Sequence, residues 1–217
     1  MLGERVHMAE FLASPSSTYV LSDDKIGWLS DHGTQDLALT PNKHHGYKSW
    51  DDFFTRHFHA DKRPVASPDD DSVIANAREP KPYKVGRKIS KRDCFWMKGQ
   101  PHSLMNMLAM DPLHEQFIGG TIYQAFLSAL SYHRWHAPVS GKVVESYLVE
   151  GTYFSEPVFE SLGDPSAGGD IDESGEKTGQ GYLTVTATRA IIIFEADNKD
   201  LGLVCFMGIG MTEGLDV

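Results

Sequence analysis

The sequence contains only two cysteines, Cys94 and Cys205, which are far apart and form no Cys-x-x-Cys motif. Their scarcity argues against a disulfide framework and against a cysteine zinc site, and it favours a reducing compartment. No window approaches the roughly 18 consecutive apolar residues that a membrane span requires. The N-terminus also lacks the charged and apolar regions of a signal peptide. We therefore expect a cytoplasmic protein without a membrane span.

The chain is short of positive charge, because its 217 residues carry a formal net charge of -10. Nucleic acids and anionic membrane surfaces both attract positively charged proteins, so neither is expected as the main partner. Basic residues do gather between Lys81 and Arg92. Such a cluster is typical of a solvated face. With 41% hydrophobic residues, the chain can still bury a sizeable core.

The first half of the chain predicts short helices. Residues 4–13 have the apolar spacing of an amphipathic helix. Ser49, with Asp52 three residues later, is a capping arrangement in front of an aromatic stripe of helical period. Such a stripe is typical of a buried helix face. A further helix is expected over 103–110, with Ser103 at its start.

From about residue 117 onward the sequence indicates β structure, because β-branched and aromatic runs alternate with Gly and Pro. A glycine-rich insertion over 162–181 interrupts these runs. We predict an α+β fold, with short N-terminal helices followed by a mainly antiparallel β sheet or sandwich. Residues 1–45 would form an N-terminal helical and loop segment, and 46–217 the core. The expected strands are 121–123, 142–149, 182–188, 190–195 and 203–207.

The greatest acid/base capacity lies between Tyr132 and Gly141, where His133 and His136 are three residues apart. Imidazole titrates near neutrality, so two of them can give and take protons at working pH. Pro138 and Gly141 place the pair just before a predicted strand. A hydrogen-bonded surface pair remains an alternative at this point. The other histidines lack a third ligand at convincing spacing, so no metal site is predicted.

Residues 132–141, Tyr-His-Arg-Trp-His-Ala-Pro-Val-Ser-Gly, resemble the Tyr-His-Arg-x-His-x-Pro-x-x-Gly signature of phosphatidylserine decarboxylases, which are pyruvoyl-dependent enzymes. Other stretches in the same order extend the resemblance over roughly residues 46 to 214. The N-terminal segment and the long insertion resemble soluble fungal relatives that include a tryptophan decarboxylase. The supporting stretches are Ser49–Arg56, Arg63-Pro64-Val65, Lys98–Leu108, Arg189–Phe194 and Gly202–Gly210.

This resemblance implies a decarboxylase in which an internal serine becomes a pyruvoyl group by self-cleavage. The ketone of that group forms a Schiff base with the substrate amine and accepts electrons as carbon dioxide leaves. The resemblance assigns His136 to self-cleavage and proton transfer. It assigns His133 to decarboxylation, as substrate contact or proton donor, with Tyr132 as a second substrate-binding residue. The implied partners are an amino acid, with an aromatic, tryptophan-like one favoured, and a second copy in a homodimer.

Two features depart from the family pattern. Where the family has Ser-Pro-x-Asp-Gly, this chain has Ala75-Asn76-Ala77-Arg78-Glu79, so the aspartate that partners the histidine is missing. Glu79 is the nearest carboxylate that could replace it as a catalytic residue. The Gly-Ser-Thr or Gly-Gly-Ser processing motif is not reached before Val217, so no residue here is nominated as the pyruvoyl precursor.

These departures leave several interpretations open. The first is the β-chain-like portion of a pyruvoyl-dependent zymogen, completed by autocatalytic cleavage and a C-terminal α chain. The second is a non-catalytic, decarboxylase-like binding module, and the third is a phosphatidylserine decarboxylase acting on phospholipid. A histidine-based metallohydrolase is the weakest alternative. Whether the chain is itself an active enzyme is left open by its sequence.

Overall fold

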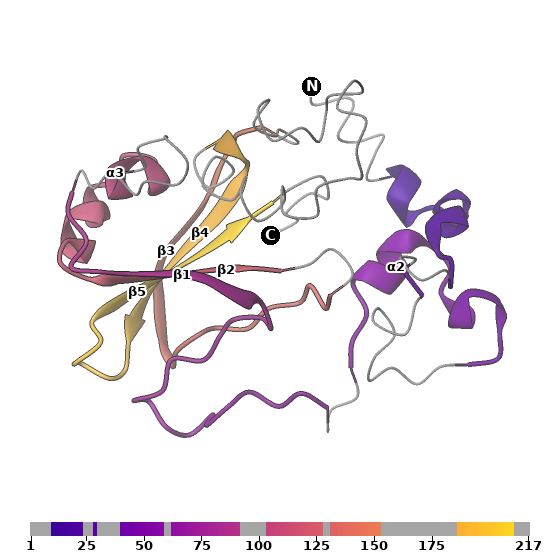
Figure 1. Ribbon diagram of the computed structural model, residues 1–217, viewed down its shortest axis with the longest axis horizontal. Coiled ribbons are helices and arrows are strands. Elements are labelled where there is room, and N and C mark those ends of the chain that lie inside the picture. Colours follow the sequence, from indigo (N-terminus) through magenta and orange to yellow (C-terminus); the bar gives the residue numbers. More distant parts are fainter. Residues whose placement is uncertain are drawn as a thin grey trace, which may run out of the picture. The chain divides into compact units, whose positions relative to one another are not determined.

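The computed structural model describes residues 10–23, 28–29, 40–58, 62–91, 103–127, 131–152 and 186–210 (Figure 1). The chain forms two compact units. Unit 1 comprises Met1–Pro80 and Leu127–Pro138, and unit 2 comprises Lys81–Phe126 and Val139–Val217. Short helices and two antiparallel sheets confirm the predicted α+β class. The predicted division at residue 45 stays a prediction.

Unit 1 contains the short helices of the N-terminal half: η1 (Pro15–Val20), η2 (Lys43–Gly46) and α2 (Trp50–Phe54). Helix α2 begins where the sequence predicts, because the Ser49 hydroxyl accepts a hydrogen bond from the Asp52 amide at 3.0 Å. Residues 10–13 are also helical, and the rest of the helix predicted over 4–13 lies outside the described residues.

The core of unit 1 is aromatic. Trp50 is 4% exposed and Phe53 is fully buried, which confirms that this stripe is a core face. Trp28 meets the Trp50 ring edge-on, with the ring centroids 5.4 Å apart. The Trp50 amide also donates to the buried hydroxyl of Ser17 at 2.8 Å, which ties α2 to η1. A five-residue helix is too short to be stable alone, so this packing maintains it.

Unit 2 contains two antiparallel sheets. Strands β1 (Lys81–Arg87) and β2 (Thr121–Phe126) form one pair. Strands β3 (Gly141–Val149), β4 (Arg189–Ala196) and β5 (Leu203–Ile209) form the other sheet, with β4 in the centre. The short helices α3 (Leu104–Met107) and η3 (Pro112–Phe117) lie between β1 and β2 in the chain.

The structure confirms four of the five predicted strands, which correspond to β2, β3, β4 and β5. The fifth, predicted over 182–188, is described only from residue 186 onward. The insertion over 162–181 lies outside the described residues. Strand β1 was not predicted. It is rich in Lys and contains Pro82, so it lacks the β-branched pattern, and its pairing with β2 makes it a strand.

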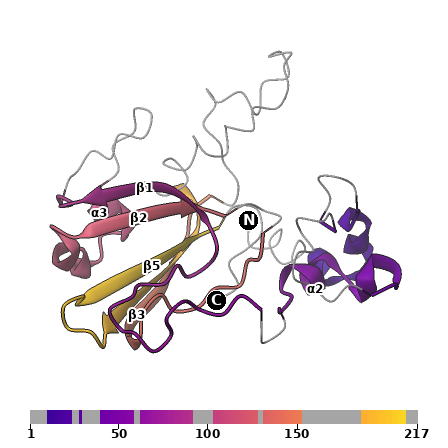
Figure 2. The same cartoon turned by 60° about the horizontal axis from the view of Figure 1, so that its bottom comes forward.

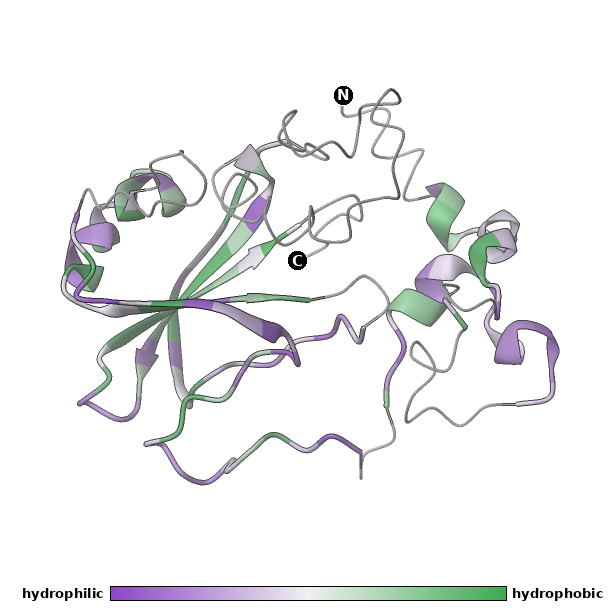
Figure 3. Cartoon of the chain, viewed as in Figure 1, coloured by the Kyte–Doolittle hydropathy of each residue, from purple (hydrophilic) through white to green (hydrophobic). Residues whose placement is uncertain are grey.

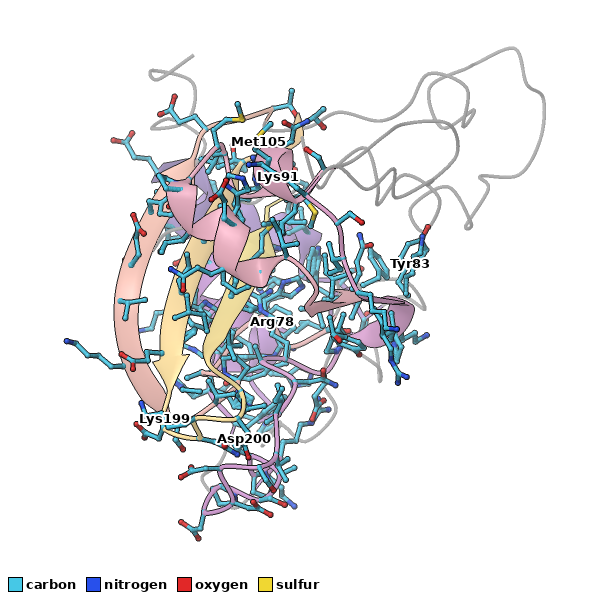
Figure 4. The ribbon with its side chains drawn as sticks, turned by 90° about the vertical axis from the view of Figure 1, so that its left-hand side faces the viewer. Arg78, Tyr83, Lys91, Met105, Lys199 and Asp200 are labelled. Atoms are coloured by element: carbon cyan, nitrogen blue, oxygen red, sulfur yellow. The ribbon has the colours of Figure 1, made fainter. Side chains whose placement is uncertain are left out.

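Strand β4 is buried on both faces, with only Glu195 exposed. Ile191 and Ile193 pack with Ile89 and with α3 on one face, the side on which the β1–β2 pair also lies (Figure 2). Ile192 and Phe194 pack with Val139 on the other face. Hydrophobic residues therefore dominate β4 and β5, whereas the turn between them, which carries Lys199 and Asp200, is hydrophilic (Figures 3 and 4).

Two side chains of this sheet hold the end of helix α3. Arg189 is 4% exposed, and its Nε and Nη2 donate to the carbonyls of Met107 and Asn106, each at 2.9 Å. The Tyr147 hydroxyl donates to the Leu108 carbonyl at 3.1 Å. The last carbonyls of a helix lack partners within the helix, so these donors satisfy them. Burial lowers the pKa of Arg189 and raises that of Tyr147.

In the part of the chain that the structure describes, no helix combines the length and apolarity required to cross a bilayer.

Replacing Ile193 by Ala is expected to lower the free energy of unfolding by about 2 to 5 kcal/mol, because the side chain is fully buried in the central strand. Leu148→Ala is the matched control, since Leu148 is 51% exposed on β3. That control should cost about 1 kcal/mol or less. Urea denaturation followed by circular dichroism measures both, and equal losses would contradict the central position of β4.

Candidate active site

Two chain segments of unit 1 that are distant in sequence run side by side and form the candidate site. The Ala75 amide donates to the Pro138 carbonyl at 2.9 Å, and the His136 amide donates to the Ala77 carbonyl at 3.0 Å. Neither segment belongs to a helix or strand at these positions. The segment that departs from the family pattern, 75–79, therefore lies directly beside the histidine segment.

Helix α2 holds the histidine segment from another direction. The Arg134 Nε donates to the carbonyls of Thr55 and Arg56, at 2.8 and 3.2 Å, just after the helix ends. The Phe54 ring packs on the His133 ring, with the centroids 4.5 Å apart and the planes inclined by 31°. Helix α2 therefore contributes both to the core, through Trp50 and Phe53, and to the site, through Phe54.

Tyr132 lies in an aromatic and cationic cluster. Its ring stacks on Phe58, with the centroids 4.0 Å apart and an angle of 28° between the planes. The guanidinium of the buried Arg56 lies 4.2 Å from the Phe53 ring centroid and 5.9 Å from that of Tyr132. Burial lowers the pKa of Arg56. These contacts hold the ring of Tyr132, the residue that precedes His133 in the sequence.

The imidazole of His136 is oriented by a backbone carbonyl. Its Nδ1 lies 3.1 Å from the Ala77 carbonyl oxygen, which also accepts the His136 amide. A carbonyl oxygen can only accept a hydrogen bond, so the neutral ring carries its proton on Nδ1. The lone pair is then on Nε2, which makes that atom the basic position of His136.

The imidazole of His133 has the opposite arrangement. Its Nδ1 lies 3.3 Å from Nη1 of Arg78. A guanidinium can only donate, so Nδ1 of His133 accepts and the neutral ring carries its proton on Nε2. Both histidines thus contact consecutive residues, Ala77 and Arg78, although no helix aligns them. The pair presents one basic nitrogen and one N–H donor.

Glu79 forms an ion pair with Arg63. The Glu79 side chain is 56% exposed, and exposed pairs of this kind contribute about 0 to 1 kcal/mol. Arg63 has a φ of 48°, an uncommon left-handed conformation for a non-glycine residue. Its guanidinium also lies 4.5 Å from the Phe58 ring centroid. Glu79, the predicted catalytic carboxylate, therefore follows Arg78 in the sequence, and its side chain is paired with Arg63.

The structure brings His133 and His136 to one place, with Tyr132 beside them in the chain and Glu79 following Arg78. Their catalytic and substrate-binding roles stay predictions. Sequence reasoning did not single out Arg78, whose only signal was its position where the family has aspartate. No cluster of three or more His, Cys, Asp or Glu side chains suited to a metal occurs among the described residues.

Comparison with known proteins identifies the family to which these residues belong. The sequence model described as phosphatidylserine decarboxylase matches residues 50–213, which include both segments of the site. This chain belongs to the phosphatidylserine decarboxylase family. The match confirms the family that the Tyr132–Gly141 motif indicates. Within the family, the fungal branch is supported by the individual relatives.

Two fungal relatives match most of the chain. Decarboxylase iboD of Amanita muscaria is 39% identical over 223 residues, which are 94% of this chain and 63% of that protein. The L-tryptophan decarboxylase of Psilocybe cyanescens is 35% identical over 225 residues, which are 94% of this chain and 51% of that protein. The chain thus spans between about half and two thirds of the length of these relatives.

A more distant relative connects the chain with the phospholipid enzymes. Phosphatidylserine decarboxylase proenzyme 3 of Schizosaccharomyces pombe is 25% identical over 165 residues, which are 76% of this chain and 15% of that protein.

The two histidines are expected to occupy opposite tautomers when neutral. In protein labelled with ¹⁵N-histidine, the nitrogen shifts at a pH above the titration of both rings should show Nδ1–H for His136 and Nε2–H for His133, because one ring faces a carbonyl and the other a guanidinium. His133→Gln and His136→Gln assign the signals. The same tautomer at both positions would refute the assignment.

Proposed function

We propose that the protein is the histidine-bearing, β-chain-like portion of a pyruvoyl-dependent amino acid decarboxylase, with an aromatic, tryptophan-like substrate favoured. The observation that carries this proposal is the pair of oppositely oriented imidazoles in the family motif, both held against Ala77–Arg78. Membership of the family supplies the reaction class. Relatives named L-tryptophan decarboxylase, 35% and 34% identical, support the substrate class.

The reaction makes two demands on the site. Loss of carbon dioxide from an α-amino acid leaves an electron pair on the α-carbon, which must then take up one proton to give the amine. A pyruvoyl ketone supplies an electron sink that protein side chains lack. The residues present fit such a group, since its formation and its use both require a base and a proton donor, and the two tautomers provide one of each.

We assign these two roles to different histidines. His136, with its proton on Nδ1 and its lone pair on Nε2, is suited to take a proton. His133, with its proton on Nε2, is suited to contact the substrate and to hand a proton to the α-carbon. The Phe54 ring packs on His133, whereas the Tyr132 ring stacks on Phe58. Tyr132 is the second residue proposed to bind the substrate. Glu79 is the carboxylate proposed to assist in place of the family aspartate.

The proposed partners follow from the assignment to a pyruvoyl-dependent decarboxylase. They are the amino acid substrate, a C-terminal α chain and a second copy in a homodimer. Relatives named proenzymes support the α chain. A cytoplasmic location is proposed on the low cysteine content of the sequence.

A non-catalytic binding module is the second candidate. It is favoured by the arginine at the position of the family aspartate and by the ion pair that holds Glu79. Such a scaffold would bind an amino acid without releasing carbon dioxide. The distinction is therefore one of turnover, measured on the full-length protein that contains this chain.

His136→Ala in the full-length protein is expected to lower amine release from L-tryptophan at least about 100-fold, because general acid–base catalysis typically contributes that much or more. His57→Ala is the control, since His57 is an exposed histidine of the same unit outside the site. Liquid chromatography of the amine measures turnover, and intact mass measures self-cleavage.

The same assay separates the alternatives. Release of phosphatidylethanolamine from phosphatidylserine vesicles, without amine from free amino acids, would identify a phospholipid enzyme. Binding of L-tryptophan with neither product would identify the non-catalytic module. Full activity in the His136→Ala variant would remove His136 from the mechanism.

A further inference from the structure

Arg78 carries a positive charge for which the described part of the chain provides no carboxylate partner. The acid next to it, Glu79, pairs with Arg63, and the other described ion pairs join Lys91 to Glu115 and Lys199 to Glu195. Arg78 is half-buried, and desolvation lowers its pKa to about 10. Its Nε is buried and has no hydrogen-bond partner among the described residues.

A half-buried cation in this state favours an anionic partner. Partly desolvated charges in proteins are normally paired, because loss of hydration is compensated only by an opposite charge with good hydrogen bonds. The hydrogen bond described for the Arg78 side chain is with Nδ1 of His133, and a neutral imidazole does not compensate the charge. A guanidinium has five N–H donors in a planar fork, and a carboxylate matches two of them at once.

We propose that Arg78 binds the carboxylate of the amino acid on which the protein acts and holds it beside His133. The inference rests on the proposed function only in that the ligand is an amino acid. His133 and Arg78 are in direct contact, so a carboxylate on the guanidinium lies next to the imidazole proposed to supply a proton. Arg78 thereby orients the group that is lost.

This role predicts an effect on binding more than on the chemical step. A contact with the intact carboxylate stabilises the bound ground state, and it does not by itself accelerate the loss of carbon dioxide. Removing Arg78 should therefore raise KM much more than it lowers kcat. The amine product has no carboxylate, so it binds more weakly than the substrate and leaves the site.

The test uses calorimetric titration of the full-length protein with L-tryptophan, L-glutamate and their α-methyl esters. The wild-type protein should bind an amino acid more tightly than its ester, and Arg78→Gln should weaken binding of the acid about 10- to 100-fold with little effect on the ester. Arg78→Lys keeps the positive charge but loses the planar guanidinium. Its affinity for the acid should therefore lie between those of the wild-type protein and Arg78→Gln. Arg87→Gln, on exposed strand β1, is the control and should bind as the wild type does.

Several results would overturn the proposal. They are equal binding of acid and ester by the wild-type protein, wild-type affinity for the acid in Arg78→Gln, binding of neither amino acid, and displacement of the acid by inorganic phosphate at lower concentration. Circular dichroism monitors folding of each variant. If Arg78→Gln fails to fold, the comparison of acid with ester in the wild-type protein and in Arg78→Lys still decides.

Turnover of the same samples separates this inference from the proposed function. Carboxylate-dependent binding without amine release supports the role of Arg78 and refutes the decarboxylase. Amine release with unchanged KM in Arg78→Gln refutes the role of Arg78 and leaves the decarboxylase intact.

Discussion

The carbonyl oxygen of Ala77 is the acceptor on which the arrangement of the site depends. It receives both the amide and Nδ1 of His136, so one atom fixes the path of the histidine segment and the tautomer of its second imidazole. Hydrogen bonds of this kind contribute about 0.5 to 1.5 kcal/mol each to stability. The importance of Ala77 therefore lies in geometry. With the bond between Ala75 and Pro138, it also places Arg78 against His133.

Helix α2 couples this arrangement to the core of unit 1. Trp50 and Phe53 are buried, whereas Phe54, on the same short helix, packs on the ring of His133. Because the helix has only five residues, it depends on its Ser49 cap and on the aromatic core. Loss of core packing would consequently disturb the imidazole as well as the helix. Stability and site geometry are linked here through neighbouring rings.

Local signals in the sequence were sufficient for much of the fold and for the histidines. The caps Ser49 and Ser103 and the β-branched runs of β3 to β5 are encoded within a few residues, so each could be predicted. Strand β1 could not, because its lysine-rich sequence is a strand only through pairing with β2. The pairing of 75–79 with 132–138 joins residues about sixty positions apart, and no local pattern reports such a contact.

The substitution at the family's aspartate position has a physical meaning that the sequence alone did not reveal. An aspartate would accept a hydrogen bond from an imidazole and stabilise its charged form, whereas Arg78 donates to His133 and brings a positive charge. Orientation of His136 comes instead from an uncharged carbonyl. The sign of the charge beside the histidines is thereby reversed relative to the family pattern. A site of this polarity is better matched to an anionic group than to a cation, because the described partners of the two Nδ1 atoms are a guanidinium and a backbone carbonyl.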